Sequence, residues 1–99
     1  MPKKKKIKSI KIGVHEYEVV YTEHLNGEVG HIDNEQLKIA ILDGLANSVE
    51  EQTLMHEVYH GIKYNLGYLD HNEEEVDGVA HGFLQFIKDN KDLIKKLLK

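Results

Sequence analysis

The first half of the chain carries short alternating patterns of apolar and polar residues, which predict β-strands. Apolar side chains recur at roughly every second position in segments 7–12 and 17–21, a period typical of strands with one buried face. Two further apolar segments follow at 29–33 and 37–42, and an Asn-Gly pair at 26–27 marks a turn before the first of them. We therefore expect a small N-terminal antiparallel β-sheet of three or four strands.

The second half begins with a pattern that predicts a long helix. Ser48 is a suitable N-cap residue because acidic residues follow it in the first turn. Gly67 is suited to the position just after the last turn. Between them, apolar residues recur at helical spacing and form a stripe that should face the core, made of Leu54, Met55, Val58, Ile62 and Leu66.

Two more helices are predicted after Gly67. Asn72 followed by Glu75 is a capping-box pattern that opens the first of them, and an apolar stripe from Val76 to Ile87 continues it. Apolar residues recur at helical spacing after Asn90, with lysines between them, which predicts a short amphipathic C-terminal helix. The fold class expected from these patterns is α+β, with the sheet preceding three helices.

Composition narrows the classes of function. The 99 residues allow one domain over 1–99, and the absence of Cys excludes a disulfide framework, a Cys-ligated zinc finger and a thiol nucleophile. A net charge of −4 without any Arg argues against a nucleic-acid partner. We expect a disordered basic tail over residues 1–6 that is not a secretory signal, no membrane span, and a cytoplasmic protein encoded by a bacterium or phage.

Seven histidines are the unusual feature of the composition, and two of them form an HExxH motif, His56-Glu57-Val58-Tyr59-His60. Side chains four residues apart project from one face of a helix, so both imidazoles can bind one zinc ion. Glu57 can then accept a proton from a water on that ion. The apolar stripe centres more than about 100° from both histidines, which predicts that they line a cleft.

The HExxH motif leaves the third zinc ligand open. The longer metzincin pattern fails here at both its Gly and its final His position. His71 is a minor option, because it can bind only if the loop after the helix folds back. A carboxylate on the next helix is the better option: Glu74 should face solvent, whereas Glu73 and Glu75 flank the apolar stripe. Periodicity does not choose between Glu73 and Glu75.

Residues 53–90 resemble the ImmA/IrrE-type metallopeptidases that are common in phages and mobile elements. The similarity rests on the run 53–62 (TLMHEVYHGI) and on the run 75–80 (EVDGVA). The resemblance implies a minimal zincin-like fold in which the two motif histidines bind zinc, Glu57 is the general base and Glu75 is the third ligand. It also implies a substrate that lies extended along an edge strand.

These observations predict a zinc metallopeptidase, a hydrolase that acts on a peptide or protein substrate. Asp77 is a candidate for orienting a histidine ligand, and any one of His15, His24 and His31 could stabilise an oxyanion if its strand borders the cleft. The alternative is a non-catalytic, zinc-stabilised binding module of phage type, which a closed site with His71 as a fourth protein ligand would favour. A nucleic-acid-associated regulator that uses Lys3–Lys6 is the weakest option.

Overall fold

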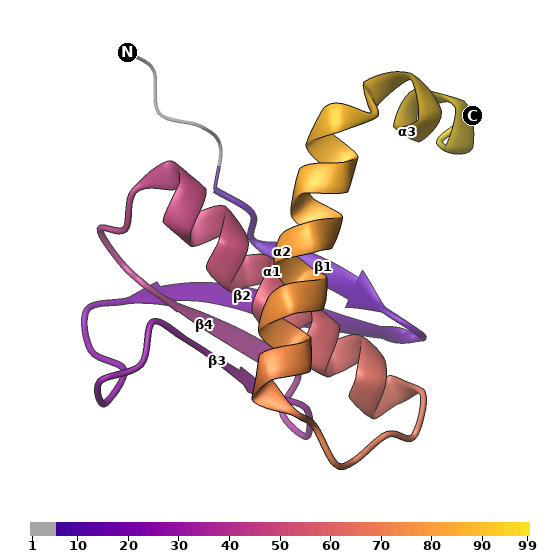
Figure 1. Cartoon of the computed structure of the whole chain (residues 1–99). Helices are drawn as coiled ribbons and strands as arrows, with labels where there is room; N and C mark the ends of the chain where they lie inside the picture. Colours follow the sequence, from indigo (N-terminus) through magenta and orange to yellow (C-terminus); the bar gives the residue numbers. More distant parts are fainter. Residues whose placement is uncertain (1–5) are drawn as a thin grey trace.

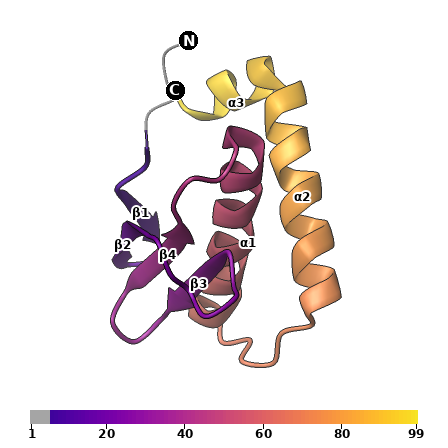
Figure 2. The same ribbon diagram turned by 90° about the vertical axis from the view of Figure 1, so that its left-hand side faces the viewer.

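A computed structural model describes residues 6–99 and has an α+β fold, as predicted. Four strands precede three helices in this part of the chain: β1 (Ser9–Ile12), β2 (His15–Thr22), β3 (Gly30–Asp33), β4 (Lys38–Leu42), α1 (Asn47–Asn65), α2 (Glu73–Asp89) and α3 (Lys91–Leu97). The elements form three layers. Helix α1 lies between the sheet and α2 (Figures 1 and 2), and α3 contacts the end of α2.

The sheet is mixed, so the prediction of an antiparallel sheet is wrong in that detail. The strand order is β1-β2-β4-β3, and β2 pairs with β4 in parallel while the other pairs are antiparallel. A tight turn follows β3, in which the Asp33 carboxylate accepts the backbone N–H groups of Glu35 (3.0 Å) and Gln36 (2.9 Å). The turn makes β3 and β4 a hairpin, and the connection 23–29 carries β3 to the edge, so β4 fills the gap beside β2.

The core lies between the two central strands and α1. Register places Val19 of β2 beside Ile39 of β4, and Tyr21 beside Ile41. Alternation along each strand then sends these apolar side chains to the face that α1 covers. The buried cluster on this face consists of Ile12, Tyr17, Val19, Ile39 and Ile41.

Leu54 and Val58 of the predicted apolar stripe pack against this cluster, but helix α1 also meets the sheet through residues that the stripe does not include. Thr53, Glu57 and Gly61 are buried, at a spacing of four residues. Ile62 and Leu66 of the predicted stripe are instead 40% and 69% exposed, so that part of the prediction is wrong. The reason is the short distance between α1 and the sheet, since a Cβ at Gly61 would lie only 2.8 Å from a methyl group of Ile12.

The helix ends agree with the sequence at two of three predicted positions. Helix α1 starts before Ser48, because the N–H of Glu50 already donates to the carbonyl of Ala46 (2.9 Å) and Ala46 occupies the N-cap. The N-cap predicted at Ser48 is therefore wrong. Gly67 follows the last turn of α1 with φ +92°, as predicted. Asn72 caps α2 by accepting the N–H of the third residue that follows it, at 3.0 Å.

The tail predicted over residues 1–6 lies outside the described residues, except for Lys6. The Lys6 ammonium is 3.0 Å from a carboxylate oxygen of Glu50 and 4.1 Å from the ring centroid of Tyr21. Between residues 6 and 99, no helix has both the length and the apolar character needed to cross a membrane.

The close approach of β3 to α1 makes Gly30 sensitive to substitution. A Cβ there would lie 2.6 Å from Cγ2 of Thr53 and 3.0 Å from Oε2 of Glu57. The Thr53 hydroxyl donates to the carbonyl of Val49 (2.7 Å), which holds the methyl group in place. We expect Gly30→Ala to lower the free energy of unfolding in urea by about 1–3 kcal/mol.

Gly82→Ala is the matched control for this prediction, because a Cβ on Gly82 meets nothing within 4 Å. Ala is the better helix former, so this variant should be more stable than the parent by about 0.5–1 kcal/mol. Equal effects of the two substitutions would contradict the close packing of β3 on α1.

Candidate metal centre

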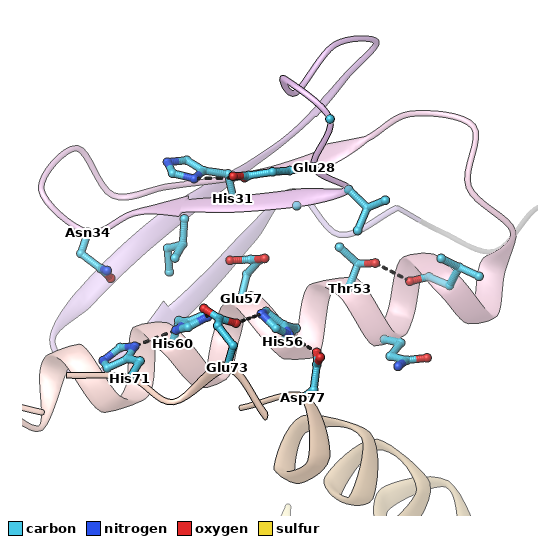
Figure 3. A pocket seen from close by; sticks show the side chains of 16 residues that line it. Glu28, His31, Asn34, Thr53, His56, Glu57, His60, His71, Glu73 and Asp77 are labelled. Carbon is cyan, nitrogen blue, oxygen red and sulfur yellow. Dashed lines mark hydrogen bonds and ion pairs between the residues drawn. The ribbon is translucent and has the colours of Figure 1, made fainter. Parts of the chain in front are cut away.

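The two histidines of the HExxH motif line a cleft of about 750 Å³ between β3, α1 and the start of α2. Four residues along α1 separate them, which places both imidazoles on the side of the helix that faces α2 (Figure 3). Their side chains are only 21% (His56) and 12% (His60) exposed. The prediction that this pair lines a cleft is therefore confirmed.

Glu73, the first residue of α2, lies between the two imidazoles. One of its carboxylate oxygens is 3.2 Å from Nε2 of His56, and the other is 3.1 Å from Nε2 of His60. One ligand atom from each of these residues lies within 4.8 Å of the other two. Two imidazole nitrogens and one carboxylate oxygen are a donor set found in catalytic zinc sites, so the residues present fit a zinc ion.

Glu73 replaces Glu75 as the candidate third ligand. The Glu75 carboxylate accepts a hydrogen bond from the ammonium of Lys63 at 2.6 Å, and Glu75 is not in the group whose ligand atoms converge. Two residues correspond to about 200° around a helix, so side chains at 73 and 75 cannot point the same way. Asn72 fixes the start of α2, and this places position 73 against the histidines.

Asp77 lies one helical turn after Glu73 and touches the other nitrogen of His56. The distance from its Oδ1 to Nδ1 of His56 is 2.6 Å. A carboxylate can only accept this hydrogen bond, so Nδ1 of His56 carries a proton and Nε2 is the nitrogen left for a metal ion. The structure thus places Asp77 in the contact that its predicted orienting role requires.

His71 reaches the site from the loop between α1 and α2. Its Nδ1 lies 2.6 Å from Nδ1 of His60, on the opposite ring edge from the Nε2 that faces Glu73. The loop therefore folds back, as ligation by His71 would require. Within residues 6–99, however, the converging ligand atoms come from His56, His60 and Glu73, without His71.

Burial and nearby charges control the proton on His60. Burial lowers the pKa of His60, and the positive charges that His56 and His71 can carry act in the same direction, whereas Glu73 opposes them. A lowered pKa favours the neutral imidazole, which is the form that binds a metal.

Glu57 is the buried carboxylate of the site. It is 7% exposed, and Figure 3 shows its carboxylate pointing into the cleft between β3 and the two imidazoles. Burial raises the pKa of Glu57 to about 7, with Glu73 and Glu28 adding to the effect and His56 and His31 opposing it. A carboxyl group that titrates near neutral pH is suited to accept and return a proton.

The sequence did not identify Glu28 as part of the cleft. Glu28 precedes β3, lines the cleft and lies 3.6 Å from Nδ1 of His31. Its position depends on the connection that carries β3 to the sheet edge, and residue spacing contains no signal for that. His31 lies on a strand that borders the cleft, as a role in stabilising an oxyanion would require.

Comparisons with protein-family models, with curated proteins and with solved structures find no match for this chain. The resemblance to the ImmA/IrrE-type metallopeptidases therefore stays a prediction.

The choice of Glu73 over Glu75 can be tested by measuring zinc affinity in competition with a fluorescent chelator. We expect Glu73→Ala to weaken zinc binding at least about 10–100-fold, the range seen when even an outer partner of a metal ligand is lost. Glu75→Ala is the matched control and should bind zinc like the parent, because the Glu75 carboxylate contacts Lys63. The reverse order of the two affinities would show that Glu75 is the ligand.

Proposed function

We propose that this protein is a zinc-dependent metallopeptidase. One observation carries the proposal: Glu73 spans the Nε2 atoms of His56 and His60, while Glu57 of the same motif is directed into the same cleft. A ligand set alone could serve a structural ion. The addition of a buried carboxylate whose pKa is raised to about 7 favours hydrolysis.

The ligand set supports a catalytic zinc better than a structural one. Structural zinc sites usually have four protein ligands, and catalytic sites have three with one open position. The group in the described part of the chain has three members, and the Glu73 side chain is 68% exposed. Zinc held there supplies a Lewis acid that polarises a carbonyl and lowers the pKa of a bound water to about 7.

Glu57 is the general base in this proposal. Its carboxylate takes a proton from the attacking water and later delivers that proton to the nitrogen of the leaving amine. Burial makes the protonated form of Glu57 more stable, relative to the ionised form, than it is for a carboxyl group in solvent. The group can therefore hold the proton between the two transfers. Asp77 keeps the His56 ring in its orientation during the reaction.

Strand β3 offers a place for an extended peptide substrate. It is the last strand in the order β1-β2-β4-β3 and pairs only with β4 within the described sheet. The carbonyl of Val29 accepts from Leu42 of β4, so by antiparallel alternation the N–H and C=O groups of Gly30 and Ile32 point away from β4. Both residues line the cleft, and a peptide could add to this edge by main-chain hydrogen bonds.

The role of Glu57 is tested by the variant Glu57→Gln, which keeps the size of the side chain and removes its basicity. We expect zinc affinity to be retained and the rate of cleavage of a quenched fluorescent peptide library to fall about 10²–10⁴-fold. Glu74→Gln is the control, since Glu74 is an exposed residue of α2 and its substitution should leave cleavage unchanged.

Two outcomes would contradict the proposal. Cleavage by Glu57→Gln at the parental rate would show that another group is the base. A parent protein that binds one zinc ion but cleaves neither the peptide library nor an unfolded protein would favour the zinc-stabilised binding module instead.

A further inference from the structure

Two short hydrogen bonds extend from His60 away from the candidate metal position. Nδ1 of His60 is 2.6 Å from Nδ1 of His71, and Nε2 of His71 is 2.6 Å from the carbonyl oxygen of Tyr68. The two imidazole planes are within 14° of parallel, and Figure 3 shows His71 beside His60 at the end of the cleft. His71 is half-buried and is not one of the three residues whose ligand atoms converge, which are His56, His60 and Glu73.

The end of α1 holds the carbonyl of Tyr68 in place. The N–H of Tyr68 donates to the carbonyl of Lys63 (2.9 Å), and the N–H of Gly67 donates to the carbonyl of Tyr64 (3.0 Å). This pair of bonds, with Gly67 at φ +92°, is the Schellman arrangement that closes many helices. The acceptor for His71 is therefore part of an ordered helix end.

The direction of each hydrogen bond follows from the carbonyl. A carbonyl oxygen only accepts, so Nε2 of His71 must carry a proton. In a neutral imidazole the other nitrogen is then an acceptor, which makes Nδ1 of His60 the donor of the bond between the two rings. With the proton of His60 on Nδ1, Nε2 is the nitrogen left for a metal ion, and in the absence of a metal the Glu73 carboxylate, 3.1 Å away, can accept a hydrogen bond from it.

The opposite arrangement is incompatible with metal binding by His60. If Nδ1 of His71 carried a proton as well, Nδ1 of His60 would have to accept, and the proton of a neutral His60 would move to Nε2. That nitrogen could no longer donate a lone pair to a cation. The partner on the far side of the ring thus determines whether a metal ion finds Nε2 of His60 free or must displace a proton from it.

We propose that His71 is a positioning residue that fixes the tautomer of His60, with the helix-end carbonyl of Tyr68 fixing His71 in turn. The inference rests on the metal-binding part of the proposed function and not on peptide cleavage. The two candidate histidine ligands then have different partners: His56 is oriented by the carboxylate of Asp77, and His60 is oriented by the neutral imidazole of His71.

The tautomers can be measured directly on metal-free protein by two-bond ¹⁵N–¹H correlation of the histidine rings. We expect His71 of the parent to carry its proton on Nε2, and His60 to carry its proton on Nδ1 in the variant Glu73→Ala, which removes the carboxylate that can accept from Nε2 of His60. A His60 of that variant with its proton on Nε2 would overturn the inference whatever the enzymatic activity, because the measurement requires no metal or substrate.

Two variants at position 71 separate hydrogen bonding from packing. His71→Phe keeps a ring and removes the acceptor, so zinc affinity should fall about 10–100-fold, the range for lost partners of histidine ligands. His71→Asn keeps an acceptor near the position of Nδ1 and should restore affinity close to that of the parent. His81→Phe, at an exposed histidine of α2, is the control and should bind zinc like the parent.

The outcomes distinguish this inference from the proposed function. Equal zinc affinities of the parent and His71→Phe, with both proteins folded by circular dichroism, would overturn the role of His71 while leaving the peptidase proposal standing. Equal losses in His71→Phe and His71→Asn would also overturn it. A parent that shows the expected tautomers and affinities but cleaves no peptide would support the role of His71 and contradict the peptidase.

Discussion

The close approach of α1 to the edge strand β3 determines where the side chains of the site can lie. Small or narrow side chains make this contact, and a Cβ on Gly30 would meet a methyl group of Thr53 at 2.6 Å. Because one face of α1 is held against the sheet in this way, the neighbouring face with His56 and His60 is held toward α2. Asn72 caps α2 at the point where Glu73 reaches both rings. The candidate centre is therefore a consequence of how three layers stack, with α1 in the middle.

Glu57 shows that this packing face is not optimised for stability alone. It stands between Thr53 and Gly61 on the side of α1 that meets β3, and it is 7% exposed. Its pKa is raised to about 7, so the unfolded chain ionises it more readily than the folded one. Between the ordinary carboxyl pKa and about 7, this difference lowers the stability of the fold as the pH rises. A buried acid retained at such a cost is typical of a functional site.

The sequence predicted those parts of the molecule that depend on local pattern. Helical spacing and caps gave α2 and its start at Asn72, and the HExxH spacing gave the histidine pair. It could not choose between Glu73 and Glu75, because that choice depends on the angle at which α2 crosses α1. The apolar stripe of α1 was right for Leu54 and Val58, which pack against the core, and wrong for Ile62 and Leu66. The buried positions Thr53, Glu57 and Gly61 form no hydrophobic period that could be detected. Residue spacing predicts which side chains share one face of a helix, but it does not predict how one helix or strand packs on another.

The strand order places β3, and not β4, at the edge of the sheet. An antiparallel meander would have left β4 at the edge of the sheet and covered both sides of β3. In the observed order β4 lies inside, where Ile39 and Ile41 are fully buried, and β3 is at the edge beside the cleft. The hairpin turn at Asp33 and the connection before Gly30 produce this order. The connection that makes the sheet mixed thus leaves one side of the β3 main chain at the sheet edge next to Glu57, where the proposed peptide substrate would pair with it.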